Sequence, residues 1–99
     1  MEIIKLNNEN FISEVKESNQ VVLVDFYADW CGPCRMLSPI MDEISEDHKV
    51  YKVNVDENED LAREYGIMSI PCVIAFKDGK EYKKSIGLAD KDTILELYK

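Results

Sequence analysis

Glycine, proline and cysteine are all scarce in this chain. Its 99 residues include 4 Gly, 3 Pro and 3 Cys, which excludes a collagen-like or linker-rich protein and argues against disorder. No apolar run comes near the roughly 20 residues that a membrane-spanning helix needs. Because 45% of the residues are hydrophobic and the length is close to the commonest domain size, we expect a single domain over residues 1–99.

Basic residues are also few. The 12 Lys and Arg are outnumbered by 20 Asp and Glu, so the formal net charge is −8. Such a chain repels a phosphate backbone and an anionic lipid surface, so we expect neither nucleic acid nor membrane as a partner. No basic segment followed by a long apolar run stands at the N-terminus, so we expect no targeting segment and a cytoplasmic location. In that reducing compartment the three cysteines are expected to be core residues, metal ligands or redox-active thiols.

Hydrophobic periodicity alternates between strand-like and helix-like segments. Strands are expected over 2–6, 21–27, 51–55, 72–76 and 81–86, and helices over 7–18, 31–47, 58–65 and from 90 onward. The order β-α-β-α-β-α-β-β-α predicts an α/β sandwich with a mixed sheet and a hairpin turn at 77–80. The inner helix faces are expected to comprise Phe11, Ile12 and Val15, and then Met36, Leu37, Ile40, Met41 and Ile44.

In α/β sheets, chemistry gathers beyond the carboxyl ends of the central strands, which here means the residues after Tyr27. Cys31 and Cys34 stand there with two residues between them. Such a pair is half of a zinc site, a redox dithiol or an accident of sequence. A four-cysteine zinc site needs a second pair, and only Cys72 and His48, a histidine that we expect at the solvated surface, remain as soft ligands.

The redox interpretation has a physical mechanism. Pro33 fits the first turn of a helix, which places Cys31 at the helix N-terminus. Unpaired backbone N–H groups and the helix dipole favour the thiolate there, and the thiolate is the form that attacks a disulfide sulfur. Cys34 lies one turn along on the same face, so it can reach the first sulfur and resolve a mixed disulfide.

The run Trp30-Cys31-Gly32-Pro33-Cys34 is identical to the active-site signature of the thioredoxins. Length and element order resemble that family over nearly the whole chain. The resemblance implies the thioredoxin-like three-layer sandwich and a protein-disulfide reductase that acts on disulfide-containing target proteins. It also implies a separate thioredoxin reductase, because the chain has no dinucleotide fingerprint of its own. We expect a monomer with no metal and no organic cofactor; a glutathione-linked glutaredoxin-like protein and a non-catalytic binding module stay open as alternatives.

Asp25 interrupts the apolar segment 21–27. A carboxylate is costly to bury, so from position alone it is either a strand-end residue that meets solvent or caps a helix, or a functional group. In thioredoxins the matching aspartate lies beneath the dithiol and assists proton transfer to and from the resolving cysteine, here Cys34. Burial is expected to raise its pKa toward the range of a general base. Lys52 matches a lysine that approaches this aspartate in many relatives; an exposed strand lysine is the alternative.

The resemblance also implies a docking surface for the substrate. Pro71 is expected to be cis, although only about 5–6% of X–Pro bonds in folded proteins are, and its loop is expected to pair with an extended substrate segment. Gly87 matches a glycine of the same groove. The docking surface is expected to comprise Trp30, Gly32, Pro33, Ile70, Pro71 and Gly87.

The sequence departs from the family pattern at two places. Cys72 stands where many thioredoxins have threonine, and it is either a small core replacement or a third oxidisable thiol. Tyr27 stands where tryptophan is common, which leaves Trp30 as the single tryptophan. The methionines that we expect to fill the core or the groove are Met36, Met41 and Met68.

Overall fold

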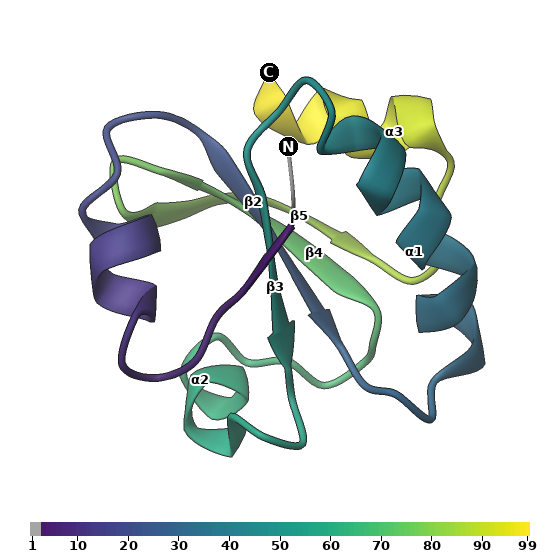
Figure 1. The fold of residues 1–99 in the computed structure, drawn as a ribbon, viewed down its shortest axis with the longest axis horizontal. Coiled ribbons are helices and arrows are strands. Elements are labelled where there is room, and N and C mark those ends of the chain that lie inside the picture. Colours follow the sequence, from purple (N-terminus) through teal and green to yellow (C-terminus); the bar gives the residue numbers. More distant parts are fainter. Residues whose placement is uncertain (1–2) are drawn as a thin grey trace.

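A five-stranded sheet forms the centre of the computed structural model, which describes residues 3–99 (Figure 1). Its strands are β1 (Ile4–Lys5), β2 (Val22–Tyr27), β3 (Val50–Asn54), β4 (Cys72–Lys77) and β5 (Lys80–Ile86), in the order β1-β3-β2-β4-β5. The first three run parallel, β4 runs antiparallel to β2, and β5 antiparallel to β4. The predicted mixed sheet is therefore confirmed, except that Glu2 of the expected first strand lies outside the described residues.

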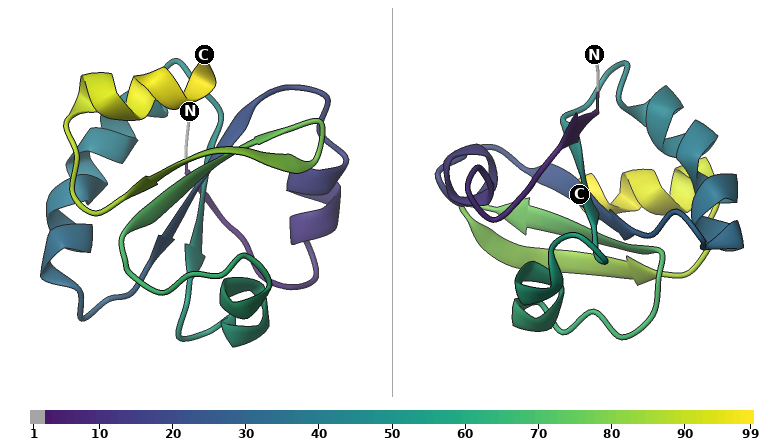
Figure 2. Two further views of the ribbon diagram at one scale, coloured as in Figure 1. Left: turned by 180° about the vertical axis from the view of Figure 1, so that it is seen from behind. Right: turned by 60° about the horizontal axis from the view of Figure 1, so that its bottom comes forward.

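Helical elements cover both faces of this sheet. One face carries α1 (Gly32–Ile44), α3 (Lys91–Leu95) and the 3₁₀ turn η2 (Glu96–Tyr98); the other carries the π-helical turn η1 (Ile12–Lys16) and α2 (Glu59–Glu64) (Figures 1 and 2). Two hydrophobic cores result, one on each side of the sheet. This arrangement confirms the predicted three-layer sandwich.

Strand β2 places its acidic residue under α1. Val24 and Phe26 belong to the core on the η1 and α2 face, whereas Leu23 belongs to the core on the α1 face. Because side chains alternate along a strand, Asp25 points to the same face as Leu23. Asp25 is only 7% exposed, so the alternative of a solvent-facing strand end is excluded, and the burial that the family resemblance implied is confirmed.

The N-terminal helix is shorter than the expected segment 7–18, and it is a wide π-helical turn rather than an α-helix. The Asn7 side chain accepts hydrogen bonds from the N–H groups of Glu9 and Asn10, so the predicted cap forms, but it closes a turn before η1 begins. Phe11 and Val15 are buried, while Ile12 is 54% exposed. Phe11 and Val15 are four positions apart and share one face of this turn, whereas Ile12, one position after Phe11, is turned away from that face.

Helix α1 buries a narrow stripe of side chains, Cys34, Leu37, Met41 and Ile44. This stripe confirms the inner face apart from two residues: Ile40 is only half-buried, and Met36 is 63% exposed. The core position expected for Met36 is therefore wrong.

Met68 is 96% exposed, so the core alternative expected for it is wrong, and its expected place in the groove stays a prediction. The surface position expected for His48 is also wrong. His48 is half-buried rather than solvated, because its ring packs 4.5 Å from the ring of Tyr98 and its Nδ1 is enclosed without a hydrogen-bond partner.

The hairpin turn between β4 and β5 forms as predicted. Asp78 and Gly79 have φ angles of 52° and 79°, the positive values that a tight hairpin requires. A Cβ atom at Gly79 would collide with the backbone carbonyl of Lys16, so this turn packs directly onto η1. Within residues 3–99, no helix is both long and apolar enough to cross a membrane.

Candidate active site

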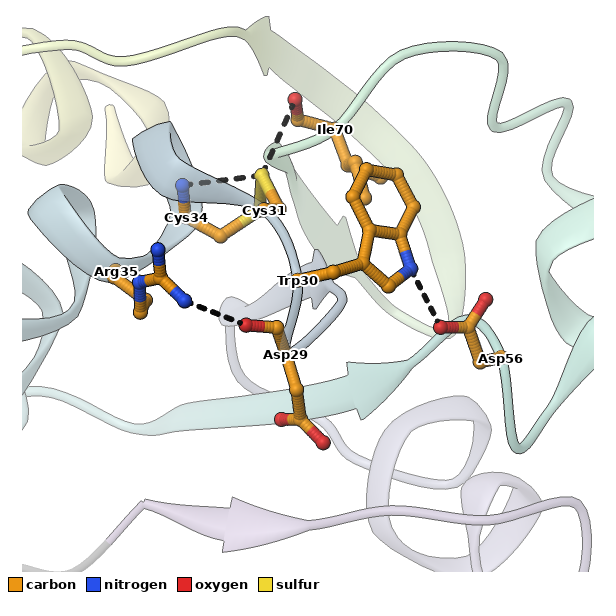
Figure 3. Close-up of a disulfide and its surroundings, with 7 residues drawn as sticks. All are labelled: Asp29, Trp30, Cys31, Cys34, Arg35, Asp56 and Ile70. Carbon is orange, nitrogen blue, oxygen red and sulfur yellow. Dashed lines mark hydrogen bonds between the residues drawn. A yellow bond between two sulfur atoms is a disulfide. The ribbon is translucent and has the colours of Figure 1, made fainter.

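Cys31 and Cys34 form a disulfide at the start of α1 (Figure 3). Cys31 is the N-cap residue, and its Sγ accepts a hydrogen bond from the Cys34 N–H at 3.2 Å. Pro33 lies in the first turn, where its missing N–H disturbs no helical bond. The predicted position of the dithiol at a helix N-terminus is therefore confirmed.

The two sulfurs have different surroundings. The Cys31 Sγ lies beside the unpaired N–H groups that begin α1, which stabilise a negative charge. It also lies 3.8 Å from the backbone carbonyl oxygen of Ile70, on the loop before β4. Cys34 lies inside the first turn and belongs to the buried stripe of α1. Both cysteines are 4% exposed, so they differ in their position on the helix and in their neighbours rather than in burial.

Asp25 supplies a titratable group on the same face of the sheet. Burial raises the pKa of its carboxyl from 3.8 to about 7, and the positive charge of Lys52 opposes that rise. Lys52 is the register partner of Asp25 on the adjacent parallel strand β3. The Asp25 Oδ1 atom is buried without a hydrogen-bond partner. A carboxyl group with a pKa near 7 can both accept and return a proton at neutral pH.

A cleft of about 250 Å³ opens beside Cys34. It is lined by Tyr27, Ala28, Asp29, Cys34, Arg35, Ser38 and Lys52. The Lys52 ammonium lies 5.7 Å from the centroid of the Tyr27 ring at this cleft. Because Cys34 lines this cleft, water can approach it although the residue is 4% exposed.

The six residues expected to form the docking surface do lie together. Trp30 is 68% exposed and Pro33 is exposed, while Gly32, Ile70 and Gly87 are half-buried. The Ile70–Pro71 bond is cis, as expected. The Gly87 N–H donates a hydrogen bond to the Pro71 carbonyl at 2.8 Å, which ties the two loops together. The Pro71 side chain itself is buried, so it supports this surface from below rather than facing a partner.

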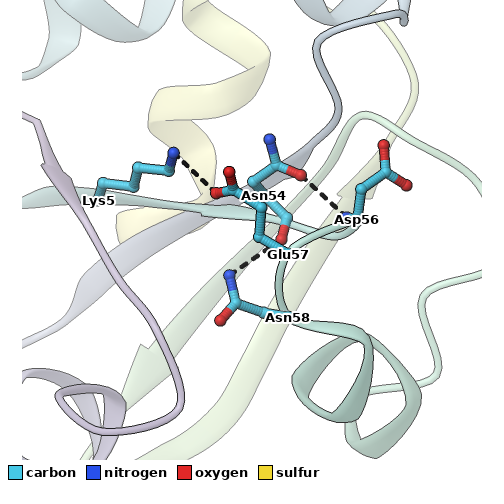
Figure 4. A network of polar contacts seen from close by, with 5 residues as sticks. All are labelled: Lys5, Asn54, Asp56, Glu57 and Asn58. Atoms are coloured by element: carbon cyan, nitrogen blue, oxygen red, sulfur yellow. Dashed lines mark hydrogen bonds and ion pairs between the residues drawn. The ribbon is translucent and has the colours of Figure 1, made fainter.

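The orientation of Trp30 depends on a residue that sequence reasoning missed. The indole Nε1–H donates a hydrogen bond to the Asp56 carboxylate at 2.8 Å (Figure 3). Asp56 is held in turn by its own N–H, which donates to the Asn54 side chain at 2.9 Å, and the Asn58 side chain donates to the Asn54 carbonyl at 3.0 Å (Figure 4). Trp30 and Asp56 are 26 positions apart, and no sequence signal pointed to this contact.

Charged residues beside the motif turn away from the sulfurs. The Arg35 guanidinium donates to the Asp29 backbone carbonyl at 3.2 Å, and Figure 3 shows the Asp29 carboxylate directed away from the disulfide. The immediate surroundings of Cys31 are therefore apolar side chains and backbone groups.

Cys72 is the free cysteine, and it is 2% exposed at the start of β4. Burial raises the pKa of its thiol, which keeps it protonated and unreactive at neutral pH. This placement favours the small core replacement over the third oxidisable thiol. Among residues 3–99, no three His, Cys, Asp or Glu side chains are grouped to hold a metal ion.

Comparisons with known proteins agree with this geometry. The family model for thioredoxin matches residues 2–99. A thioredoxin of Rickettsia felis is 48% identical, with 92% of this chain and 90% of the relative aligned, and a thioredoxin of Bacillus subtilis is 41% identical over 98% and 95%. The structure of a mutant thioredoxin from Halobacterium salinarum has a TM-score of 0.90 at 39% identity, covering 98% of this chain and 88% of that one.

These relatives decide between the open alternatives. Neither a glutaredoxin-like protein nor a binding module without chemistry accounts for a thioredoxin match over nearly the whole chain, together with the cysteine pair that this match includes. The chain belongs to the thioredoxin family, and it is a protein-disulfide oxidoreductase whose redox centre is the Cys31–Cys34 pair.

Proposed function

We propose that Cys31 is the attacking thiol and that Cys34 is the resolving thiol. We propose Asp25 as the base that accepts the proton of Cys34. The observation that carries this assignment is the position of the two cysteines on α1: one caps the helix and the other lies a turn inside it, above the face of the sheet that holds Asp25.

The reaction proceeds in two exchanges. The Cys31 thiolate attacks one sulfur of a target disulfide, so a mixed disulfide forms and the other target sulfur leaves as a thiolate. Cys34 then gives its proton to Asp25 and attacks the Cys31 sulfur, which expels the second target thiolate. The target gains two electrons, and the protein is left with the Cys31–Cys34 disulfide. Because both thiols and the base belong to one chain, we propose that a monomer suffices.

The target is proposed to bind as an extended segment across the docking surface. The apolar groups of Trp30, Pro33 and Ile70 offer a contact area beside the sulfur. The backbone for strand-like pairing is that of Ile70, since Pro71 has no N–H and its carbonyl already accepts a hydrogen bond from Gly87. A Cβ atom at Gly32 would meet nothing within 4 Å, so this position next to Cys31 is open to an approaching partner.

A separate reductase is proposed to restore the dithiol. The electrons are held in the cysteine pair itself, so the exchange requires no metal and no organic cofactor on this chain. A thioredoxin reductase would meet the same docking surface, because it must reach the same Cys31–Cys34 disulfide as the targets do. Disulfide-containing proteins and this reductase are the two classes of partner.

Trapping of the mixed disulfide tests the order of the two thiols. In Cys34→Ser, a disulfide-containing protein such as insulin should stay attached, and mass mapping should place the bond at Cys31. Cys31→Ser should show neither insulin reduction nor a trapped adduct, and Cys72→Ser is the matched control that should keep full activity. An adduct at Cys34 in Cys31→Ser, with activity retained, would refute the assignment.

A further inference from the structure

Met68 is more exposed than any other large hydrophobic side chain that the structure describes. It is 96% exposed, against 68% for Trp30 and 63% for Met36. The exposure does not come from an unanchored loop. The neighbouring Ile67 packs against the core, and its N–H donates to the Ala62 carbonyl at 2.8 Å. The backbone is thus fixed, and it turns the thioether of Met68 outward.

The backbone that carries Met68 leads directly to the redox centre. Met68 is two residues before Ile70, whose carbonyl oxygen lies 3.8 Å from the Cys31 Sγ. Adjacent Cα atoms are about 3.8 Å apart, so the Cα atoms of Met68 and Ile70 lie within about 8 Å of each other. Met68 therefore extends the docking surface along the loop that leads to Pro71. Flexible and polarisable methionine side chains suit a surface that accepts varied partners.

We propose that Met68 is a modification site at which a peroxide lowers the affinity for protein substrates. The thioether sulfur attacks an oxygen of hydrogen peroxide: the O–O bond breaks and an S–O bond forms. One peroxide oxygen stays on the sulfur, and the other leaves with both hydrogens as water. The sulfur is oxidised by two electrons to the sulfoxide, and the peroxide is reduced by the same two electrons. The inference rests on the docking surface proposed above.

The modification changes docking without changing the thiol chemistry. A sulfoxide oxygen is a strong hydrogen-bond acceptor that water satisfies in the free protein. When an apolar partner segment covers it, that hydrogen bond is lost and binding weakens. Cys31, Cys34 and Asp25 stay as they were, because Met68 belongs to the loop before β4 and makes no contact with the buried side chains beneath α1.

The chain offers its own controls for oxidation. Met36 is 63% exposed and lies outside the buried stripe of α1, and Met41 is 1% exposed in the core. The protein is treated with hydrogen peroxide in its disulfide form, which shields Cys31 and Cys34, and peptide masses are followed over time. Met68 should gain one oxygen atom first, Met36 more slowly and Met41 last. Protection of Met68 relative to Met36 would overturn the proposal.

Activity is then measured after removal of peroxide and reduction of the disulfide with dithiothreitol. The KM for insulin should rise at least about 5-fold, the lower end of the range expected when a covered polar group loses its hydrogen bond with water. The rate with a small aromatic disulfide, which needs little docking, should not change. Met68→Leu should keep its insulin KM after peroxide, whereas Met36→Leu should lose affinity as the wild type does.

The outcomes separate this inference from the proposed function. If Met68 is fully oxidised and the insulin KM is unchanged, or if Met68→Leu stays as sensitive as the wild type, the proposal is wrong. If the untreated protein reduces the small disulfide but not insulin, the docking surface itself is wrong. If it reduces neither, the assignment of the thiols fails.

Discussion

Asp25→Asn should stabilise the protein at neutral pH and leave it unchanged in acid. In the folded chain the pKa of this carboxyl is about 7, against 3.8 for a solvated aspartate, and the first cause is burial. The folded state therefore holds the proton more tightly than the unfolded state does. Stability from the protonated group is complete below pH 3.8, and it is lost as pH rises from there through about 7.

The size of the effect follows from the two pKa values. A difference of about 3 pH units, at about 1.36 kcal/mol per unit, corresponds to about 4 kcal/mol of unfolding free energy lost by the wild type at pH 8. The substituted amide would carry no charge at any pH and would avoid this cost. The variant should accordingly exceed the wild type by about 4 kcal/mol at pH 8 and by nearly nothing at pH 3.5.

Denaturant unfolding of the disulfide form, at a series of pH values, measures this difference. The single tryptophan, Trp30, reports the transition. Asp29→Asn is the matched control: it neutralises an exposed carboxylate close by, and it should change stability by less than about 0.5 kcal/mol. A difference between wild type and Asp25→Asn that stays constant from pH 3.5 to pH 8 would refute a buried carboxyl group with a raised pKa.

Two other substitutions test the turn and the indole contact. Gly79→Ala should lower the unfolding free energy by at least about 2 kcal/mol more than Gly66→Ala does. Both glycines have positive φ angles, but only a Cβ atom at Gly79 would meet backbone atoms. Equal losses of unfolding free energy in thermal or denaturant melts would contradict the packing of the hairpin on η1. Asp56→Ala should lower the fluorescence anisotropy of Trp30 without changing the melting temperature, since it removes the partner of the indole N–H. The control Glu57→Ala should leave the anisotropy unchanged, and an equal change in both variants would show that the contact does not hold the ring.

Local chemistry explains why so much of the site could be predicted from the sequence. Pro33 between the two cysteines fixes the helix start, and residue alternation along β2 fixes the face of Asp25 once its neighbours are known to be buried. The hairpin at Asp78 and Gly79 is likewise a property of adjacent residues. Each of these signals acts over a few residues, so a single sequence carries it.

The predictions that failed concern residues whose positions depend on the packing of the folded chain. Ile12 and Met36 are apolar and lie in helical segments, but each is rotated about the helix axis away from the buried side chains, so hydrophobicity alone misplaced them. The position of His48 depends on Tyr98, 50 positions later. The cis bond at Pro71 followed only from the family resemblance, because local preference favours trans.

Alkylation of the reduced protein tests the central claim most directly. At pH 7, with iodoacetamide and peptide mass mapping, Cys31 should react at least about 10-fold faster than free cysteine, because the N-terminus of α1 favours its thiolate. Cys34, inside the first turn of α1, and Cys72, in the core, should stay unmodified on that timescale. If Cys31 reacts no faster than free cysteine, or if Cys34 reacts first, the proposed division of roles between the two thiols is wrong.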